Sequence, residues 1–288
     1  MNLILLECRI SFREVFLNVY FKYFTETTIN DFITQMFRPR VIPVLLLKNE
    51  GLVKSVKFKN HRYIGDPINA VKIFNDLKAD ELVFLDILAS QENRVISESF
   101  VTKVGEETNM PFAVGGGIHT LDQIRRIINA GAEKVVINRE AILRPNFIRE
   151  AADEFGSSTI VVCIDVKKTF FGNEKVYVLN GTKATKKSPI EHAKLMEEKG
   201  VGEIIVQSIT RDGTMEGYDL SLLREISEAV SVPIIALGGA GNIRHLREAY
   251  EDAYVTGLAA GSMFVYHGRR KAVLINYPNK EEIRSISE

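Results

Sequence analysis

The sequence of 288 residues has no net charge, only two cysteines and no long apolar run. Its 37 basic residues are balanced by 37 acidic ones, so no overall field attracts nucleic acid or an anionic membrane, and any anion site has to be local. Cys8 and Cys163 lie far apart, without metal-ligand spacing, as is typical of reduced thiols. The apolar runs are shorter than the roughly 18 residues of a membrane span. We therefore expect a cytoplasmic protein that binds no metal, nucleic acid or membrane.

What the sequence does contain, from Arg40 onward, is an alternation of short apolar runs and amphipathic segments. This alternation predicts repeated βα units and a parallel sheet. Eight strands are expected at residues 41–47, 81–87, 111–116, 134–138, 159–166, 203–209, 232–239 and 256–262. A small hairpin is expected within residues 169–187, after the fifth strand.

An internal repeat favours one domain over two. The segment "DPINAVKIFNDLKADELVFLDI" matches "SPIEHAKLMEEKGVGEIIVQSI", and "MPFAVGGGI" matches "VPIIALGGAG". The same 122 residues separate Pro67 from Pro189 and Pro111 from Pro233. Two half-barrels of four βα units close without exposed sheet edges, so we predict an α/β fold, a single (βα)8 TIM barrel over residues 36–288.

Residues 1–35 do not fit this pattern. They mix apolar, aromatic and charged residues, and Glu7 and Arg9 interrupt what would otherwise be a signal-peptide core. We interpret them as an extension upstream of a working protein that begins at Met36. The alternative is a peripheral amphipathic helix.

Glycine-rich turns follow several of the predicted strands, where ligands of such barrels bind. Gly115 to Gly117 stand at the end of the third strand, and Gly238, Gly239 and Gly241 stand at the end of the seventh, the equivalent point of the second half. Gly261 and Ser262 end the eighth strand. Backbone N–H groups at such turns bind phosphate, although glycines are also ordinary loop residues. Because the turns recur in both halves, we predict a ligand with a phosphate at each end.

Charged side chains gather at both ends of the predicted strands. Asp86, Asp165 and Asp212 stand at the carboxyl ends, where a carboxylate inside an apolar run is a candidate for acid–base catalysis. Asp212 also suits an ordinary turn. The opposite ends carry two cations and two anions, Arg40, Glu81, Lys134 and Glu203. They form either a ring of ion pairs that closes the barrel floor or a charged gate.

Taken together these residues resemble the cyclase subunit of imidazole glycerol phosphate synthase, from about Arg40 to Tyr266. The most specific pieces are "GDP", "DELVFLDI", "PFAVGGGIH", "EKVVIN", "CIDVKK", "EIIVQSITRDGTMEGYD" and "PIIALGGAG". The resemblance implies ammonia-dependent cleavage and cyclisation of a ribotide with two phosphates. It also implies a glutaminase partner at the N-terminal face of the barrel, and no cofactor.

The family's functional residues carry over to this sequence, with one change at a phosphate site and one exception in the catalytic pair. The resemblance implies that Arg40, Glu81, Lys134 and Glu203 form an ammonia gate and that Lys54 lies near the substrate, although the spacing around residues 49–51 is altered. It implies phosphate binding by Gly117, Asn138, Arg139, Asp212, Gly213, Gly239, Gly261 and Ser262. Arg139 replaces a small hydroxyl residue, which favours a different anion there.

The exception concerns the two opposed aspartates that act as general acid and base in this family. Asp165 matches the second, but Leu46 stands at the position of the first, and leucine cannot transfer a proton. Asn49 and Glu50 are the substitutes within reach. The sequence therefore predicts that the ordinary cyclase reaction is crippled unless another group takes over.

Two segments, "KFKNHRYIGDP" and "GRRKAVLINYPNKEEI", resemble a second branch of the family. In that branch the barrel and its glutaminase feed ammonia to an N-acetyl sugar amidotransferase in surface polysaccharide biosynthesis. The alternative is a genuine cyclase of histidine biosynthesis. A sugar-phosphate isomerase barrel is disfavoured, because its chemistry also requires both opposed carboxylates and has no use for a charged gate.

Overall fold

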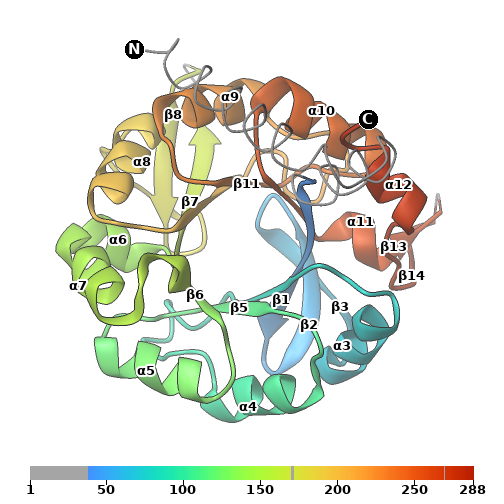
Figure 1. The fold of residues 1–288 in the computed structure, drawn as a ribbon, viewed down its shortest axis with the longest axis horizontal. Coiled ribbons are helices and arrows are strands. Elements are labelled where there is room, and N and C mark those ends of the chain that lie inside the picture. The colour runs from blue at the N-terminus through green and yellow to red at the C-terminus, as the bar shows by residue number, and fades with distance from the viewer. Residues whose placement is uncertain (1–37, 170–171, 269) are drawn as a thin grey trace, which may run out of the picture. The chain divides into compact units, whose positions relative to one another are not determined.

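A computed structural model describes residues 38–169, 172–268 and 270–288, so the predicted extension at residues 1–35 lies outside the described residues. Eight parallel strands form a closed barrel, as the sequence predicts (Figure 1). They are β1 (Arg40–Lys48), β4 (Leu82–Asp86), β5 (Phe112–Gly115), β6 (Lys134–Ile137), β7 (Ile160–Lys168), β10 (Glu203–Ser208), β11 (Ile234–Leu237) and β12 (Gly257–Ala260). Pairing of β6 with β7 joins the two half-barrels on one side, and pairing of β1 with β12 joins them on the other.

Helices surround the barrel (Figure 1). They are α3 (Pro67–Asp76), α4 (Glu98–Glu107), α5 (Leu121–Asn129), α6 (Arg139–Leu143), α7 (Pro145–Phe155), α8 (Pro189–Glu198), α9 (Leu220–Ala229), α10 (Ile243–Ala253), α11 (Ser262–Val265) and α12 (Lys280–Arg284), with a short 3-10 helix at Ser157–Thr159. Local chemistry sets their starts: Thr120 and Gln123 form a capping box at α5, and Asp66 caps α3 with proline in the first turn. Within the described residues, no helix has the length and apolar character that crossing a membrane demands.

Strand β1 shows how the barrel separates two apolar cores. Successive side chains of a strand point to opposite faces. Val41, Leu45 and Leu47 pack in the layer between sheet and helices, whereas Ile42, Val44 and Leu46 pack inside the barrel. The leucine that replaces the expected aspartate therefore points inward.

Two hairpins extend the sheet beyond the barrel strands. The predicted hairpin after the fifth strand is present, with β8 (Glu174–Val178) antiparallel to both β7 and β9 (Lys183–Ala184). The sequence did not predict the hairpin of β2 (Gly51–Val56) and β3 (Lys59–Gly65), which folds back on β1. Its turns place Asn49, Glu50, Lys57 and Phe58 at positive φ without glycine, so the usual hairpin signal is missing. A short pair, β13 (Tyr266–His267) and β14 (Ala272–Val273), lies near the C-terminus.

Helix α8 buries a histidine, which makes stability depend on pH. His192 is 1% exposed, and its Nδ1 has no hydrogen-bond partner among the described residues. Burial, with a smaller contribution from the charge of Lys187, lowers the pKa of His192 to about 4. Between pH 6.5 and 4, His192 is therefore protonated in the unfolded chain but stays neutral in the folded chain.

We expect the free energy of unfolding to fall as pH drops from 6.5 to 4, by about 3 kcal/mol in total from this residue. Urea unfolding of the native chain and of His192→Leu at several pH values measures this contribution. The difference between the two should shift in favour of the variant as pH falls through this window. A constant difference would show that His192 takes up its proton as readily in the folded chain as in the unfolded chain, and would contradict the lowered pKa.

Candidate functional site

The carboxyl ends of the barrel strands surround two adjacent cavities. The larger, about 280 Å³, is lined by the predicted site residues Leu46, Gly117, Asn138, Arg139 and Asp165 among others. The smaller, about 20 Å³, is lined by Lys54, Asp212, Gly213, Gly239, Gly261 and Ser262 among others. Leu46 and Gln207 line both cavities. The structure therefore brings together all the residues predicted for catalysis and phosphate binding.

The loop after β5 forms the glycine-rich wall of the larger cavity. Gly117 has φ of +67°, and a Cβ there would lie 1.8 Å from the carbonyl oxygen of Arg94, so only glycine fits. Across the cavity, Asn138 Nδ2 donates to the carbonyl oxygen of Cys163 at 2.9 Å. Arg139 lines the cavity, and its side chain makes no hydrogen bond or ion pair with a described residue. Its guanidinium is thus available to an anion at this end of the site.

Lys54 lines the smaller, second glycine-lined cavity. Its Nζ donates to the carbonyl oxygen of Val44 at 2.6 Å, and a Cβ on Gly261 would lie 2.3 Å from Nζ. Burial lowers the pKa of Lys54 to about 8, and the charge of Asp212 opposes that shift. The amine is therefore still mostly protonated at neutral pH and is placed to meet an anion beside Gly261 and Ser262.

Asp165 has the properties of a proton-transfer group. Its side chain is buried at 8% exposure, Asn138 Nδ2 donates to it at 3.3 Å, and Cys163 Sγ donates at 3.5 Å. Burial raises the pKa of Asp165 to about 7, the bond from Cys163 lowers it, and the charge of Asp212 raises it. A carboxyl group that titrates near neutral pH can both donate and accept a proton under physiological conditions.

No carboxylate from β1 faces this group, because Leu46 occupies the inward position. Asn49 and Glu50 are exposed in the turn between β1 and β2 and line neither cavity, so they do not take its place in this conformation. The carboxylate that the structure places within electrostatic reach of Asp165 is that of Asp212.

Asp212 and Asp86 both hold loops in place. Asp212 accepts hydrogen bonds from Ser55 Oγ at 2.8 Å and from the Phe58 backbone N–H at 3.2 Å, which anchors the β2–β3 hairpin. Burial is the main cause of the raised pKa of Asp212. Asp86 pairs with Arg94 and caps the following turn. Sequence analysis missed Ser55 and Phe58, because nothing in their own segment points to Asp212, more than 150 residues away.

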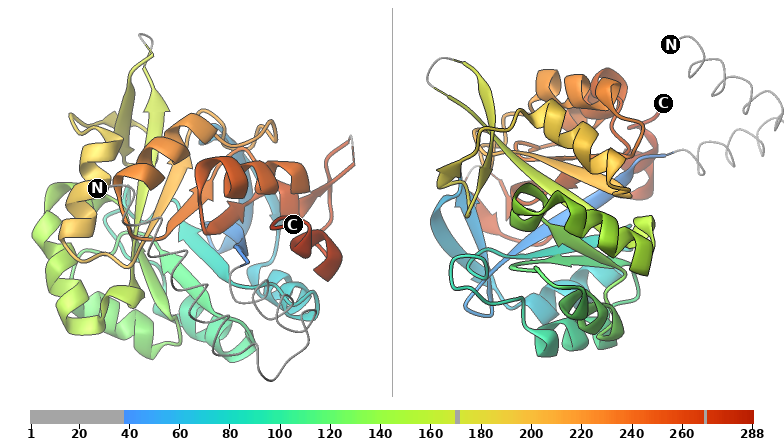
Figure 2. Two further views of the ribbon diagram at one scale, coloured as in Figure 1. Left: turned by 45° about the horizontal axis from the view of Figure 1, so that its top comes forward. Right: turned by 90° about the vertical axis from the view of Figure 1, so that its left-hand side faces the viewer.

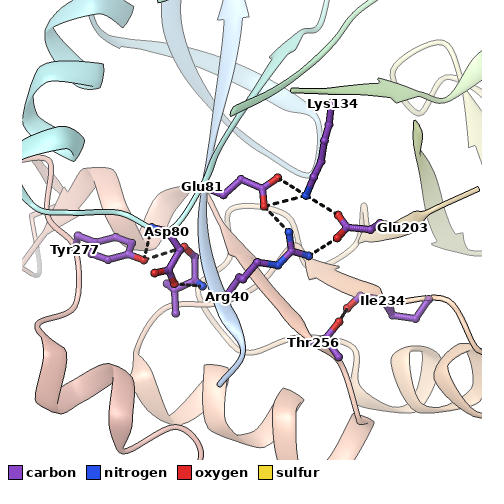
Figure 3. A network of polar contacts seen from close by, with 9 residues as sticks. Arg40, Asp80, Glu81, Lys134, Glu203, Ile234, Thr256 and Tyr277 are labelled. Carbon is purple, nitrogen blue, oxygen red and sulfur yellow. Dashed lines mark hydrogen bonds and ion pairs between the residues drawn. The ribbon is translucent and has the colours of Figure 1, made fainter. Parts of the chain in front are cut away.

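At the opposite end of the barrel, the four predicted charges form one network, the floor ring of Arg40, Glu81, Lys134 and Glu203 (Figure 3). Lys134 Nζ lies 3.1 Å from an oxygen of each glutamate, and Arg40 pairs with both glutamates. The side chain of Glu81 is 4% exposed, so these two cations stand beside it where water is largely excluded. The predicted ring of ion pairs is therefore present.

A second cluster, which sequence analysis did not predict, ties the C-terminal segment to the floor (Figure 3). The Tyr277 hydroxyl donates to the carbonyl oxygen of Val41 at 2.9 Å and accepts from the Asp80 backbone N–H at 3.1 Å. Asp80 in turn accepts from the Val41 backbone N–H at 2.9 Å. These bonds fix the backbone next to Arg40 and Glu81, two members of the floor ring.

Comparison with known proteins agrees with this arrangement. A family model described as "Histidine biosynthesis protein" matches residues 40–271. The chain belongs to this family. A Pseudomonas aeruginosa protein provisionally named imidazole glycerol phosphate synthase subunit hisF2 is 48% identical over 248 residues, covering 86% of the chain and 99% of that protein. The chain is thus a HisF-like member, as the resemblance in its motifs predicted.

Two further relatives carry similar provisional names. A Leptospira interrogans protein named as imidazole glycerol phosphate synthase subunit HisF is 46% identical over 252 residues, covering 87% of the chain and 99% of that protein. A Vibrio vulnificus protein named as subunit hisF3 is 43% identical over 257 residues, covering 89% of the chain and 99% of that protein. The similarity therefore spans the whole barrel.

Proposed function

We propose that this HisF-like barrel receives ammonia from a glutaminase docked at its N-terminal face and supplies it to an N-acetyl sugar amidotransferase. On this proposal it is a diverged subunit of an ammonia-dependent complex in surface polysaccharide biosynthesis. The observation that carries the proposal is Leu46, which points into the barrel where the cyclase reaction needs the partner of Asp165. The chain keeps the residues for handling ammonia and anions but lacks half of the acid–base pair.

The interior of the barrel supports a route for ammonia. The floor ring stands at one end and the cavities at the other. Between them the interior is packed with apolar side chains such as Ile42, Val83 and Ile205. An apolar interior disfavours charged ammonium and accepts neutral ammonia, because burying an unpaired charge is costly. The same side chains would keep water from following it.

The two glycine-lined cavities support an anionic ligand at the carboxyl ends. Arg139 with the Gly117 loop suits one anionic group, and Lys54 with Gly261 and Ser262 suits a second. A ligand with two phosphates fits this arrangement. It would bind here whether or not the barrel turns it over.

The second candidate function is a genuine cyclase subunit of histidine biosynthesis. One observation favours it: Asp165 is buried in the cavity with its pKa raised to about 7, which suits proton transfer. In that case Asp165, helped by Lys54 or Asp212, would have to act as general acid and general base in steps that the family divides between two aspartates.

A cyclase assay of the unmodified chain decides between the two functions. The chain is supplied with ammonium salt and the bisphosphorylated ribotide, and separately with its glutaminase and glutamine. We expect glutamine-dependent release of ammonia but little or no imidazole glycerol phosphate. Turnover at the rate of a two-aspartate cyclase, or rescue of a strain lacking that subunit, would overturn the proposed function.

The floor ring provides a further prediction. Replacing Lys134 with Met leaves both glutamates short of a partner. We expect severalfold less amidated sugar per glutamine hydrolysed, because a disrupted ring no longer passes ammonia efficiently. Amidation driven by added ammonium salt should be unchanged.

The matched control is Arg244→Met, which removes an ion pair with Glu248 on the outer helix α10. It should change neither the amount of amidated sugar per glutamine hydrolysed nor the amidation driven by added ammonium salt. If Lys134→Met and native protein formed the same amount of amidated sugar per glutamine hydrolysed, the floor ring would not be part of the ammonia route.

A further inference from the structure

The two hairpins beyond the barrel carry a concentration of positive charge. Residues 48–65 and 167–187 together contain eleven lysines and arginines but only two acidic residues. Because the whole chain is neutral, the remainder has an excess of acidic residues. Local charge of one sign steers a partner of the opposite sign toward the surface that bears it.

These hairpins meet over the site. Phe58, in the turn between β2 and β3, lies against Gly181 of the β8–β9 turn, where a Cβ would come within 2.9 Å of its ring. Phe58, His61, Leu179 and Asn180 all line the larger cavity. Two segments far apart in sequence therefore form one surface at the mouth of the cavity. Figure 2 shows β7 and β8 extending well beyond the barrel.

Five exposed lysines on this surface make no ion pair with a described residue. They are Lys57, Lys59, Lys175, Lys183 and Lys186, and we call them the basic rim. Other cations of the same segments are engaged: Lys168 pairs with Glu174 and Asp219, and Arg62 lies over the ring of Tyr266. The basic rim therefore consists of lysines without an ion-pair partner among the described residues, next to cations that already have partners.

The basic rim does not serve the ligand inside the barrel. No residue of the rim lines either cavity. Lys54 and Arg139 already provide cations there. The ammonium groups are therefore available to a body that approaches the mouth from outside. That is also where ammonia leaving the barrel has to be collected.

We propose that the basic rim is the docking surface for an acidic face of the ammonia-accepting enzyme. The inference rests on the proposed function, because it takes that enzyme to be the N-acetyl sugar amidotransferase. Charge complementarity at an exposed rim mainly raises the association rate and fixes the orientation of the complex. Docking at this face would leave the floor ring free for the glutaminase, so ammonia would cross the barrel from one partner to the other.

The test compares two charge-reversal variants of the full chain in complex with its glutaminase. In the rim variant Lys57, Lys59, Lys175 and Lys183 are changed to Glu. In the control variant Lys103 and Lys194, exposed on the outer helices α4 and α8, are changed to Glu. Binding of the purified amidotransferase is measured at about 50 and 300 mM salt. Glutamine-dependent ammonia release is measured in parallel.

We expect the rim variant to bind at least about tenfold more weakly at low salt, with most of the loss in the association rate. The native complex should itself weaken at high salt. The control variant should bind like native protein, and all three should release ammonia equally. Equal binding by rim variant and native protein, or no binding by native protein, overturns the docking surface.

Binding of heparin and single-stranded RNA shows whether the rim is specific for the amidotransferase. If both bind the rim as tightly as the amidotransferase does, with the same lysine dependence, the rim is a general polyanion site and the proposal fails. The cyclase assay on the unmodified chain is independent of the rim. Failure of the docking surface and failure of the proposed function are therefore distinguishable.

Discussion

The Leu46→Asp variant is expected to gain ammonia-dependent cyclase activity of about 10² to 10⁴-fold over the native chain, the usual contribution of general acid–base catalysis. Leu46 points into the barrel and lines both cavities, so an aspartate there would face the ligand. Asp165, Lys54 and the glycine-lined sites are already assembled around it. Formation of imidazole glycerol phosphate from ammonium salt and the bisphosphorylated ribotide measures the gain.

The matched control is Leu46→Asn, which has nearly the shape of aspartate but transfers no proton. A gain in Leu46→Asp alone would show that the missing carboxylate is what stops the reaction. Equal gains in both variants would show that the polarity or the smaller size of the new side chain, rather than proton transfer, restores the reaction. No gain in either, with both variants folded and binding the ribotide, would mean that the site has diverged beyond this position.

The Asp165→Asn variant is expected to be more stable than the native chain at pH 8, by about 4 kcal/mol. The pKa of Asp165 is about 7 in the folded chain, against an ordinary value of 3.8. A folded pKa that is raised means that the contribution of this carboxyl to stability is fully present below 3.8. It is lost as pH rises through 7, because the buried group must then ionise. Asparagine removes that loss.

Unfolding in urea at about pH 4, 6 and 8 measures this difference. The advantage of the variant should be small at pH 4 and grow to its full value near pH 8. Asp76→Asn, an exposed carboxylate at the end of α3, is the control and should change stability by less than about 0.5 kcal/mol throughout. An advantage of Asp165→Asn that does not vary with pH would contradict a folded pKa near 7.

Much of the fold could be predicted from the sequence, because the repeat and the apolar periods are local signals. The eight strands and the hairpin after β7 follow from them. The β2–β3 hairpin could not be predicted from such signals. Its turns rely on non-glycine residues at positive φ, and its anchor is Asp212, far along the chain. Residues 1–35 as an extension, and the gate and phosphate roles of the site residues, stay predictions.

The sequence by itself determined which groups are available: a leucine at position 46, one aspartate at 165, four charges at strand starts and two lysine-rich segments. Only the tertiary structure decided how those groups are arranged and which neighbours they have. Barrel closure brings Arg40, Glu81, Lys134 and Glu203 into one ring. Burial, which no single segment specifies, moves the pKa of Asp165 and Lys54 toward neutrality. The physical reason is that desolvation and ion pairing depend on neighbours that only the closed barrel supplies.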